Sequence, residues 1–170
     1  MIKISVCDDD EGQLTFFKQC FMEYNEKHKE KIEANFYQSV QSLLNEKKFS
    51  PDVYFLDIEL QDGNGLKLAG KIRTRNSKIP IVFITSHEEF MPEAFHVHAY
   101  QYLNEKKNAQ AVENVLNQLA DYFSEQNQIF SFQTYGEMIS LDCRNIICFT
   151  SEKRKNIVIA ENGEFEYYGK

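Results

Sequence analysis

The sequence predicts an α/β fold with a doubly wound parallel sheet of five strands, followed by a short all-β segment at the C-terminus. Up to about residue 123, short apolar runs alternate with segments whose apolar residues recur at helical spacing. This alternation is typical of a parallel sheet whose strands are joined by right-handed helical crossovers. The pattern changes near Ser124, and from Ile129 onward only short β-like runs follow. We therefore expect a first domain at 1–123, a linker at 124–128 and a partial β segment at 129–170.

The individual elements follow from this pattern. Short apolar runs predict the five strands of the sheet, at 2–7, 32–37, 52–57, 80–85 and 99–103. Helical spacing predicts a helix from about Asp10, a short helix near Val40, a helix after the turn at 62–65, and helices at 90–97 and 109–123. Further strands are expected at 129–135, 138–141, 146–150, 156–161 and 164–168. The dipeptide Asn162-Gly163 between the last two is a strong hairpin signal.

Composition narrows the class of protein. The 170 residues suffice for one full domain plus a short remainder. No apolar stretch approaches the roughly 18 residues of a membrane span, and the N-terminus lacks the charged-then-apolar pattern of a signal peptide. The four cysteines form no Cys-x-x-Cys pair, so reduced thiols are expected, with Cys7 and Cys20 buried. These features indicate a cytoplasmic protein with no membrane contact, and the net charge of −7 argues against a whole-surface nucleic-acid binder.

Acidic residues follow two of the expected strands. Asp8 and Asp9 come directly after the first strand, and Asp57 ends the third. Because the carboxyl ends of parallel strands meet at one edge of a sheet, these carboxylates should converge there. They would repel one another unless a hard cation lay among them, and Mg²⁺ is the expected ion. A metal beside a carboxylate nucleophile is what phosphoryl transfer to Asp requires, whereas Asp8 and Asp9 alone could simply cap a helix and occupy its first turn.

The order of these motifs resembles the receiver domain of bacterial two-component response regulators, over roughly residues 1–122. The resemblance rests on the acid pair after strand one, an Asp after strand three, a Gly eight residues later, a Thr after strand four and a Tyr in strand five: Asp8, Asp9, Asp57, Gly65, Thr85 and Tyr102. It implies a flavodoxin-like arrangement of the sheet.

This resemblance also implies a role for each residue. Asp57 would accept a phosphoryl group from a sensor histidine kinase. Asp8, Asp9, Asp57 and the backbone carbonyl of Glu59 would hold Mg²⁺. Thr85 and Tyr102 would form the switch that responds to the phosphoryl group. Such a protein is a signalling switch more than a turnover enzyme, and its phosphorylation is expected to favour a homodimer through the fourth helix, fifth strand and fifth helix.

One position departs from the receiver pattern. Receivers usually carry Lys and then Pro just after strand five, but Glu105 and Lys106 occupy these positions here. A carboxylate aimed at the site would add repulsion to an anionic pocket. Either the loop shifts so that Lys106 becomes the cation that pairs with the phosphoryl group, or Glu105 turns outward and phosphorylation is weakened.

The C-terminal part resembles the opening of a LytTR-type DNA-binding domain. The resemblance is carried by the runs at 139–142, 146–151 and 157–159, and about the first half of such a domain is present. Lys153, Arg154 and Lys155 are candidate phosphate contacts. Residues 125–170 contain seven acids and five Lys or Arg, a net charge of −2. We therefore expect promoter binding through a complete LytTR domain and weak or absent DNA binding by this chain.

Two other functions stay open at this point. A pseudo-receiver would be a protein-interaction module that never carries phosphate, and the missing lysine favours it. A haloacid-dehalogenase-like phosphatase also uses a strand-end Asp nucleophile with Mg²⁺, but such enzymes carry a second Asp two residues later. Glu59 occupies that position here.

Overall fold

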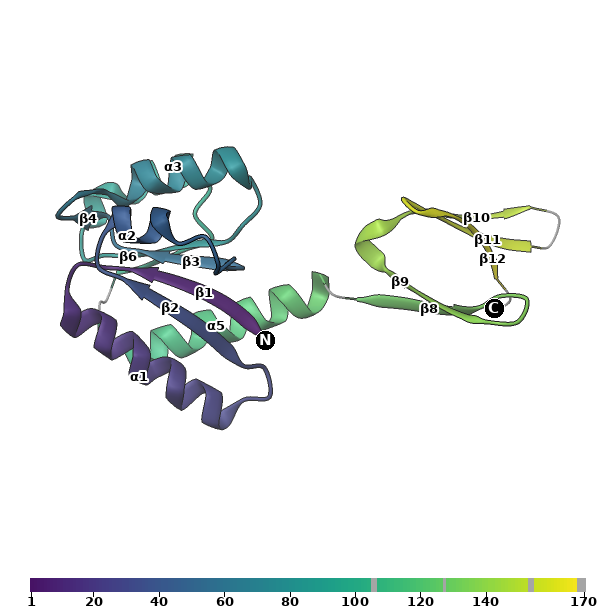
Figure 1. Cartoon of the computed structure of the whole chain (residues 1–170), viewed down its shortest axis with the longest axis horizontal. Helices are drawn as coiled ribbons and strands as arrows, with labels where there is room; N and C mark the ends of the chain where they lie inside the picture. Colours follow the sequence, from purple (N-terminus) through teal and green to yellow (C-terminus); the bar gives the residue numbers. More distant parts are fainter. Residues whose placement is uncertain (105–106, 127, 153–154, 168–170) are drawn as a thin grey trace. The chain divides into compact units, whose positions relative to one another are not determined.

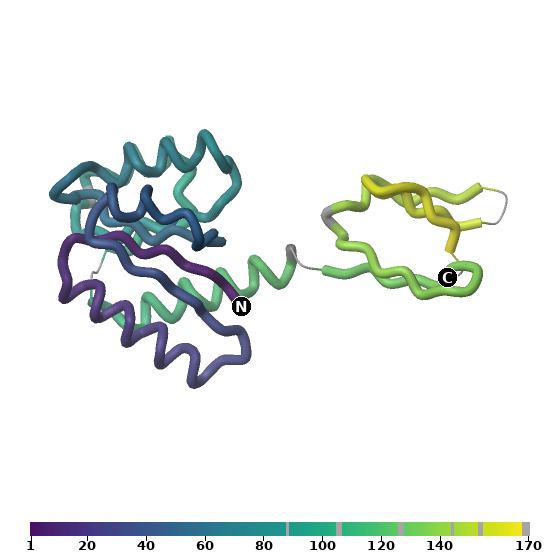
Figure 2. The backbone as a smooth tube through the Cα atoms, in the orientation of Figure 1, coloured from purple at the N-terminus to yellow at the C-terminus, as the bar shows by residue number. Residues whose placement is uncertain are grey.

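The computed structural model of the chain describes residues 1–104, 107–126, 128–152 and 155–167, without the side chains of Glu88, Gln126 and Arg144. The chain divides into two compact units, Met1–Asn117 and Gln118–Lys170. Their backbones can be followed in Figure 2. Each unit is described by itself below.

A five-stranded parallel sheet forms the centre of the N-terminal unit. Its strands lie in the order β2-β1-β3-β6-β7, and each neighbouring pair is parallel. The strands are β1 (Ile2–Cys7), β2 (Ile32–Tyr37), β3 (Val53–Leu56), β6 (Ile81–Ile84) and β7 (Gln101–Leu103). The order reverses at β1, as it must in a doubly wound sheet. The predicted fold class is confirmed.

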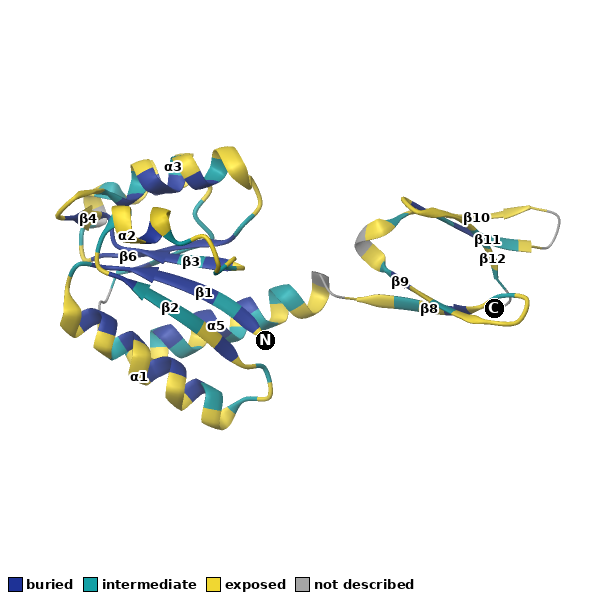
Figure 3. Cartoon of the chain, viewed as in Figure 1, coloured by how far each residue is buried: buried dark blue, intermediate teal, exposed yellow. Residues whose placement is uncertain are grey.

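Helices cover both faces of this sheet. They are α1 (Glu11–Lys27), α2 (Val40–Asn45), α3 (Gly65–Arg75), α4 (Met91–His96) and α5 (Ala109–Gln126). Figure 1 shows α2 and α3 over one face, with α1 and the first part of α5 on the other. Since both faces are covered, the central strands are almost wholly buried (Figure 3). This explains why their sequences are continuous apolar runs and not alternating ones.

Different side chains fill the two layers of the core. Leu68 and Ile72 of α3 pack with Leu56 and Phe83 of the sheet and with Ala94 of α4. On the other face, the aromatic rings of Phe17 and Phe21 from α1 each lie 5.9 Å from that of Phe55, centroid to centroid. The helical spacing read from the sequence is thus the spacing of core contacts.

The start of α1 settles which acid caps it. The side chain of Asp10 accepts hydrogen bonds from the backbone N–H groups of Gly12, at 2.8 Å, and Gln13, at 3.4 Å. Asp8 in turn accepts from the Asp10 N–H at 2.9 Å. Asp10 is therefore the N-cap, which leaves the helix-capping reading of Asp8 and Asp9 without support.

A small hairpin follows β3 that the sequence analysis did not predict. Its strands, β4 (Glu59–Leu60) and β5 (Gly63–Asn64), have only two residues each. At its turn, the Asp62 carboxylate accepts hydrogen bonds from the N–H groups of Val40 and Gln41, both at 2.9 Å. These bonds lower the pKa of Asp62 and fasten the hairpin to the first turn of α2.

Helix α5 is longer than predicted. It continues to Gln126, through residues where we expected the start of the linker at 124–128, and residue 127 lies outside the described residues. No Gly or Pro interrupts residues 109–126, so nothing local stops the helix at residue 123. The division of the chain into domains at this point stays a prediction.

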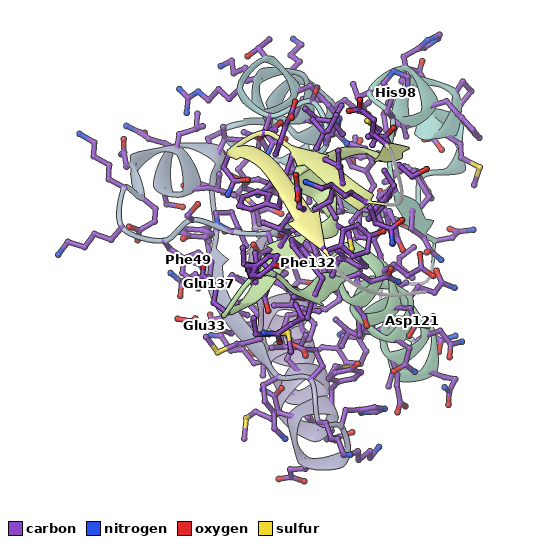
Figure 4. The ribbon with its side chains drawn as sticks, turned by 90° about the vertical axis from the view of Figure 1, so that its right-hand side faces the viewer. Glu33, Phe49, His98, Asp121, Phe132 and Glu137 are labelled. Atoms are coloured by element: carbon purple, nitrogen blue, oxygen red, sulfur yellow. The ribbon has the colours of Figure 1, made fainter. Side chains whose placement is uncertain are left out.

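Beyond the end of α5, the C-terminal unit is all-β, as predicted. A hairpin of β8 (Ile129–Gln133) and β9 (Met138–Asp142) accompanies an antiparallel sheet of β10 (Ile146–Glu152), β11 (Lys155–Ala160) and β12 (Gly163–Tyr167). A short 3₁₀ turn lies at Cys143–Asn145, and another lies in the N-terminal unit at Glu88–Phe90. The small core contains Phe132, labelled in Figure 4, whose ring contacts those of Phe165 and Tyr167. In the described part of the chain, no helix has the length and apolar character needed to cross a bilayer.

Candidate functional site

Three carboxylates meet at the carboxyl edge of the parallel sheet. Asp8 and Asp9 follow β1, and Asp57 follows β3, which pairs with β1 in parallel. One carboxylate oxygen from each residue lies within 4.8 Å of the others. Asp8 is 0% exposed and Asp57 is 2% exposed, so two of the three charges are held away from bulk water. The convergence predicted from the sequence is therefore present.

A tight loop closes over Asp57. The Asp57 carboxylate accepts a hydrogen bond from the Ile58 N–H at 2.8 Å, and the Ile58 carbonyl accepts one from the Gly65 N–H at 2.8 Å. A Cβ atom on Gly65 would lie only 2.0 Å from the Asp57 carbonyl oxygen. Only glycine fits at this position, because any side chain would push into the backbone of Asp57.

The electrostatics of the site are those of a cation-binding pocket. Burial, with added repulsion from Asp62, Asp8, Asp57 and Asp9, raises the pKa of the neighbouring Cys7 thiol to about 12. Burial disfavours a charge of either sign, but the repulsion from the four carboxylates disfavours a further negative charge and favours a positive one. An all-oxygen donor set of carboxylates suits Mg²⁺ and lacks the His and Cys ligands that favour zinc. The residues present thus fit the expected ion.

Thr85 and Tyr102, the two predicted switch residues, are linked through a single residue between them. Thr85 is buried directly after β6, and its hydroxyl accepts a hydrogen bond from the His87 N–H at 3.3 Å. Tyr102 lies in β7, and its hydroxyl donates to the His87 carbonyl oxygen. The backbone of His87 therefore joins the two side chains.

His87 also contacts two acids at this edge, and sequence reasoning missed both contacts. Its Nε2 lies 3.2 Å from a Glu59 carboxylate oxygen, and its Nδ1 lies 2.9 Å from one of Glu89. A hydrogen bond from its own N–H and one from the His87 ring lower the pKa of Glu89. Glu59 and His87 stand two residues after Asp57 and Thr85, on adjacent strand ends. That matched spacing was the signal available in the sequence, but we expected only a backbone role for Glu59 and none for His87.

The remaining predicted residues are described only in part. Glu105 and Lys106 lie outside the described residues, but the next residue, Lys107, places its ammonium near the start of α1, 4.0 Å from where a Cβ on Gly12 would stand. Lys153 and Arg154 also lie outside. Lys155 is exposed, and its ammonium forms an ion pair with Glu166 at 2.9 Å.

Comparison with known proteins agrees with this geometry. The response regulator receiver domain family matches residues 4–117, about two thirds of the chain. The chain belongs to this family, and its N-terminal unit is the receiver domain of a response regulator, a signalling switch more than an enzyme in the usual sense.

Two curated relatives give the context of this domain. A response regulatory protein of Yersinia pestis is 29% identical over 120 residues, covering 71% of this chain and 49% of the relative. The sensory transduction protein LytR of Staphylococcus haemolyticus is 32% identical over 95 residues, covering 56% of this chain and 36% of the relative. The chain thus spans about half or less of the length of these relatives.

Solved receiver domains share the fold. A CheY-like receiver from Methanospirillum hungatei superposes with a TM-score of 0.63 at 18% identity, covering 74% of this chain and 98% of that one. The Thermotoga maritima response regulator TrrA, solved in complex with Mg²⁺ and a beryllium fluoride, gives a TM-score of 0.60 at 22% identity, with 70% and 99% coverage.

Proposed function

We propose that this chain is a phosphorylation-dependent response regulator in which Asp57 accepts a phosphoryl group from a sensor histidine kinase. The observation that carries the proposal is the buried cluster of Asp8, Asp9 and Asp57 at the carboxyl edge of the sheet. Mg²⁺ would be held by these carboxylates and by the backbone carbonyl of Glu59. When bound, the ion neutralises charge on the phosphoryl group during transfer.

The residues of the chain supply the nucleophile and its orientation. A carboxylate oxygen of Asp57 forms the new O–P bond, and the bond from phosphorus to the kinase imidazole breaks, leaving that imidazole neutral after protonation. The Ile58 N–H donates a 2.8 Å hydrogen bond to Asp57 Oδ1, which holds this oxygen in place while the other carboxylate oxygen attacks phosphorus. Fixing the nucleophile in this way removes orientational freedom that the transfer would otherwise have to overcome.

Intact mass spectrometry tests the acceptor. We expect the wild-type chain to gain the mass of one phosphoryl group when incubated with acetyl phosphate and Mg²⁺, and Asp57→Asn to gain none. Equal gain by the variant would assign the phosphoryl group to another residue. No gain by wild type would favour the pseudo-receiver, and rapid turnover of the phosphodonor with phosphate release would favour the haloacid-dehalogenase-like phosphatase.

Thermal melting tests the metal. Mg²⁺ that binds only the folded chain raises the melting temperature by mass action. Asp9 is the least buried of the three acids and accepts a hydrogen bond from the Gln61 N–H at 3.2 Å. Asp9→Ala should therefore fold and lose the Mg²⁺-dependent rise. An unchanged rise would move the metal to other residues.

The loop after β7 would supply the cation that pairs with the phosphoryl group. We propose Lys106 for this role, because a lysine has a long, flexible stem and a one-residue offset from the usual position can be bridged. Lys106→Ala should slow phosphorylation by acetyl phosphate, and Glu105→Lys should restore or improve it. An unchanged rate in Lys106→Ala would support a loop in which Lys106 faces solvent, and would refute its role as the pairing cation.

The output of the switch would be dimerisation through α4, β7 and α5. Support comes from exposed apolar side chains beside Tyr102: Phe95 is 79% exposed and Met91 is 38% exposed, over a hollow of about 190 Å³. Activation with beryllium fluoride should raise the fraction of dimer in analytical ultracentrifugation, and Phe95→Asp should prevent this. A monomer under both conditions would refute this surface as the output.

Transcription would be controlled through a LytTR-type domain at the C-terminus. Two observations support this: the described residues after α5 form β-strands joined by short turns, and relatives of this chain carry the name transcriptional regulatory protein LytR. The net charge of −2 over residues 125–170 and the ion pair of Lys155 with Glu166 predict weak DNA binding by this chain. Fluorescence anisotropy with a labelled duplex should show no sequence preference, and tight specific binding would contradict this expectation.

A further inference from the structure

An apolar groove runs between α2 and α3, at the end of the sheet opposite the acid cluster. It has a volume of about 450 Å³, and its floor consists of Leu43, Ile72 and Ile79 beside the half-buried ring of Tyr54. Leu44, which is 38% exposed, forms one wall. Gly65 at the start of α3 lies against Asp57, whereas the groove lies against the end of this helix. Eleven residues of α3 span about 16 Å, so the two sites are separate.

The rim of this groove is cationic in a chain that is acidic overall. Between Gly63 and His87 the sequence has five Lys or Arg and no Asp or Glu, whereas the whole chain has 19 basic and 26 acidic residues. Lys71 and Arg75, one turn apart on α3, line the groove. The helix dipole favours cations in the last turn and accounts for Arg75, but Lys71 stands before that turn.

Both charges are available to a partner. In the part of the chain that the structure describes, neither the Lys71 ammonium nor the Arg75 guanidinium forms an ion pair or hydrogen bond. By contrast, the Arg73 guanidinium is engaged by the backbone carbonyl oxygens of Val97, Ile79 and His98.

Among the described residues that line the groove, Glu46 is the one acid, and it is hydrogen-bonded to the loop that follows it. The Glu46 carboxylate accepts hydrogen bonds from the N–H groups of Lys48, at 2.6 Å, and Phe49, at 3.4 Å, and these bonds lower its pKa. Glu46 therefore stays ionised with its carboxylate bonded to its own loop, and the groove is lined by two positive charges, Lys71 and Arg75, against this one negative charge.

We propose that this groove binds an acidic peptide segment of a partner protein, with one apolar side chain of that segment in the groove. Leu43, Ile72 and Ile79 would receive the apolar side chain, and Lys71 and Arg75 would pair with carboxylates that flank it. Apolar contacts give such a site its affinity, while charge complementarity selects the partner and speeds association. A segment that lacks either the acids or the apolar side chain would contact only the apolar floor or only the two cations, and should bind more weakly.

Fluorescence anisotropy provides the test, with a labelled peptide of sequence Glu-Glu-Leu-Phe-Glu-Glu-Leu and the full chain. We expect saturable binding that weakens with salt, because exposed charges are screened. The double variant Lys71→Glu, Arg75→Glu should bind at least about tenfold more weakly. Leu44→Ser, which removes apolar surface from the wall without touching a charge, should also weaken binding. A peptide with Ser in place of Leu and Phe should not bind.

Lys67→Glu is the matched control, since it reverses the same charge at the exposed start of α3 and does not line the groove. It should bind the peptide as wild type does, within about twofold. Equal loss in Lys67→Glu would show attraction to the whole helix and overturn the groove. Absence of saturable binding by a folded wild-type chain would overturn the proposal. So would concentration-dependent self-association that the double variant abolishes, because the occupant would then be a second copy.

Discussion

Gly65→Ala places a single methyl group against the backbone of the proposed phosphoacceptor. The added Cβ would stand 2.0 Å from the Asp57 carbonyl oxygen and 2.9 Å from its carbonyl carbon. These are backbone atoms of a residue that is itself fixed by β3, so no flexible side chain can move aside. We expect the substitution to destabilise the receiver unit and to impair phosphorylation.

The size of the effect follows from the overlap. Ordinary carbon–oxygen contacts lie at about 3.3 Å or more, so the two backbones must separate by about 1.3 Å. Forcing an extra carbon into a packed site costs about 1–3 kcal/mol, and we expect the upper part of that range. A loss of about 2–3 kcal/mol lowers the melting temperature by roughly 8–12 °C in a unit of this size. A displacement of about 1 Å at a reacting group costs about 10²-fold in rate.

Gly70→Ala is the control on the same helix. A Cβ on Gly70 would meet no atom within 4 Å. Removing a glycine from a helix interior stabilises by about 0.5–1 kcal/mol, so this variant should melt slightly above wild type and accept phosphate at the same rate. Both variants are compared by thermal melting and by acetyl phosphate labelling read as intact mass. If Gly65→Ala melted and reacted like Gly70→Ala, the close approach of α3 to Asp57 would be refuted.

Three further substitutions or reagents test other contacts. Tyr102→Phe removes the hydroxyl that donates to the His87 carbonyl, so it should leave phosphorylation intact but reduce the fraction of dimer formed with beryllium fluoride. Unchanged dimerisation would show that the Tyr102 hydroxyl is not part of the switch. Asp62→Ala removes the hydrogen bonds to α2 and should lower the melting temperature at pH 7. Because the folded-state pKa of Asp62 lies below its usual 3.8, this stabilisation is complete above 3.8 and should fade as pH falls below it; a gap from wild type that widens there would contradict the assignment. A thiol reagent at pH 8 should label the exposed Cys143 and Cys148 quickly and the buried Cys7 and Cys20 only on unfolding. Burial raises the pKa of Cys20 to about 11 and that of Cys7 to about 12, so fast labelling of all four cysteines would refute this packing.

Sequence reasoning found the acid cluster because strand direction alone determines it. Parallel strands must bring the residues after β1 and β3 to one edge, and no side-chain detail is needed to conclude that Asp8 and Asp57 meet there. It missed the contacts of His87 because these depend on how a loop folds back across two strand ends. The groove beside Lys71 was equally hidden, since a groove is a property of two packed helices and not of either one.

The contacts of His87 suggest how the two halves of the switch depend on each other. Its N–H is bonded to the hydroxyl of Thr85, and its carbonyl accepts from Tyr102. If Thr85 turns its hydroxyl toward a phosphoryl group, it gives up the bond that holds this segment. The His87 ring also contacts the carboxylate of Glu59, two residues from Asp57, at 3.2 Å. Under the proposed function, phosphorylation would therefore remove one of these three contacts that hold this short segment, and would shift it between an arrangement bonded to Thr85 and one released from it.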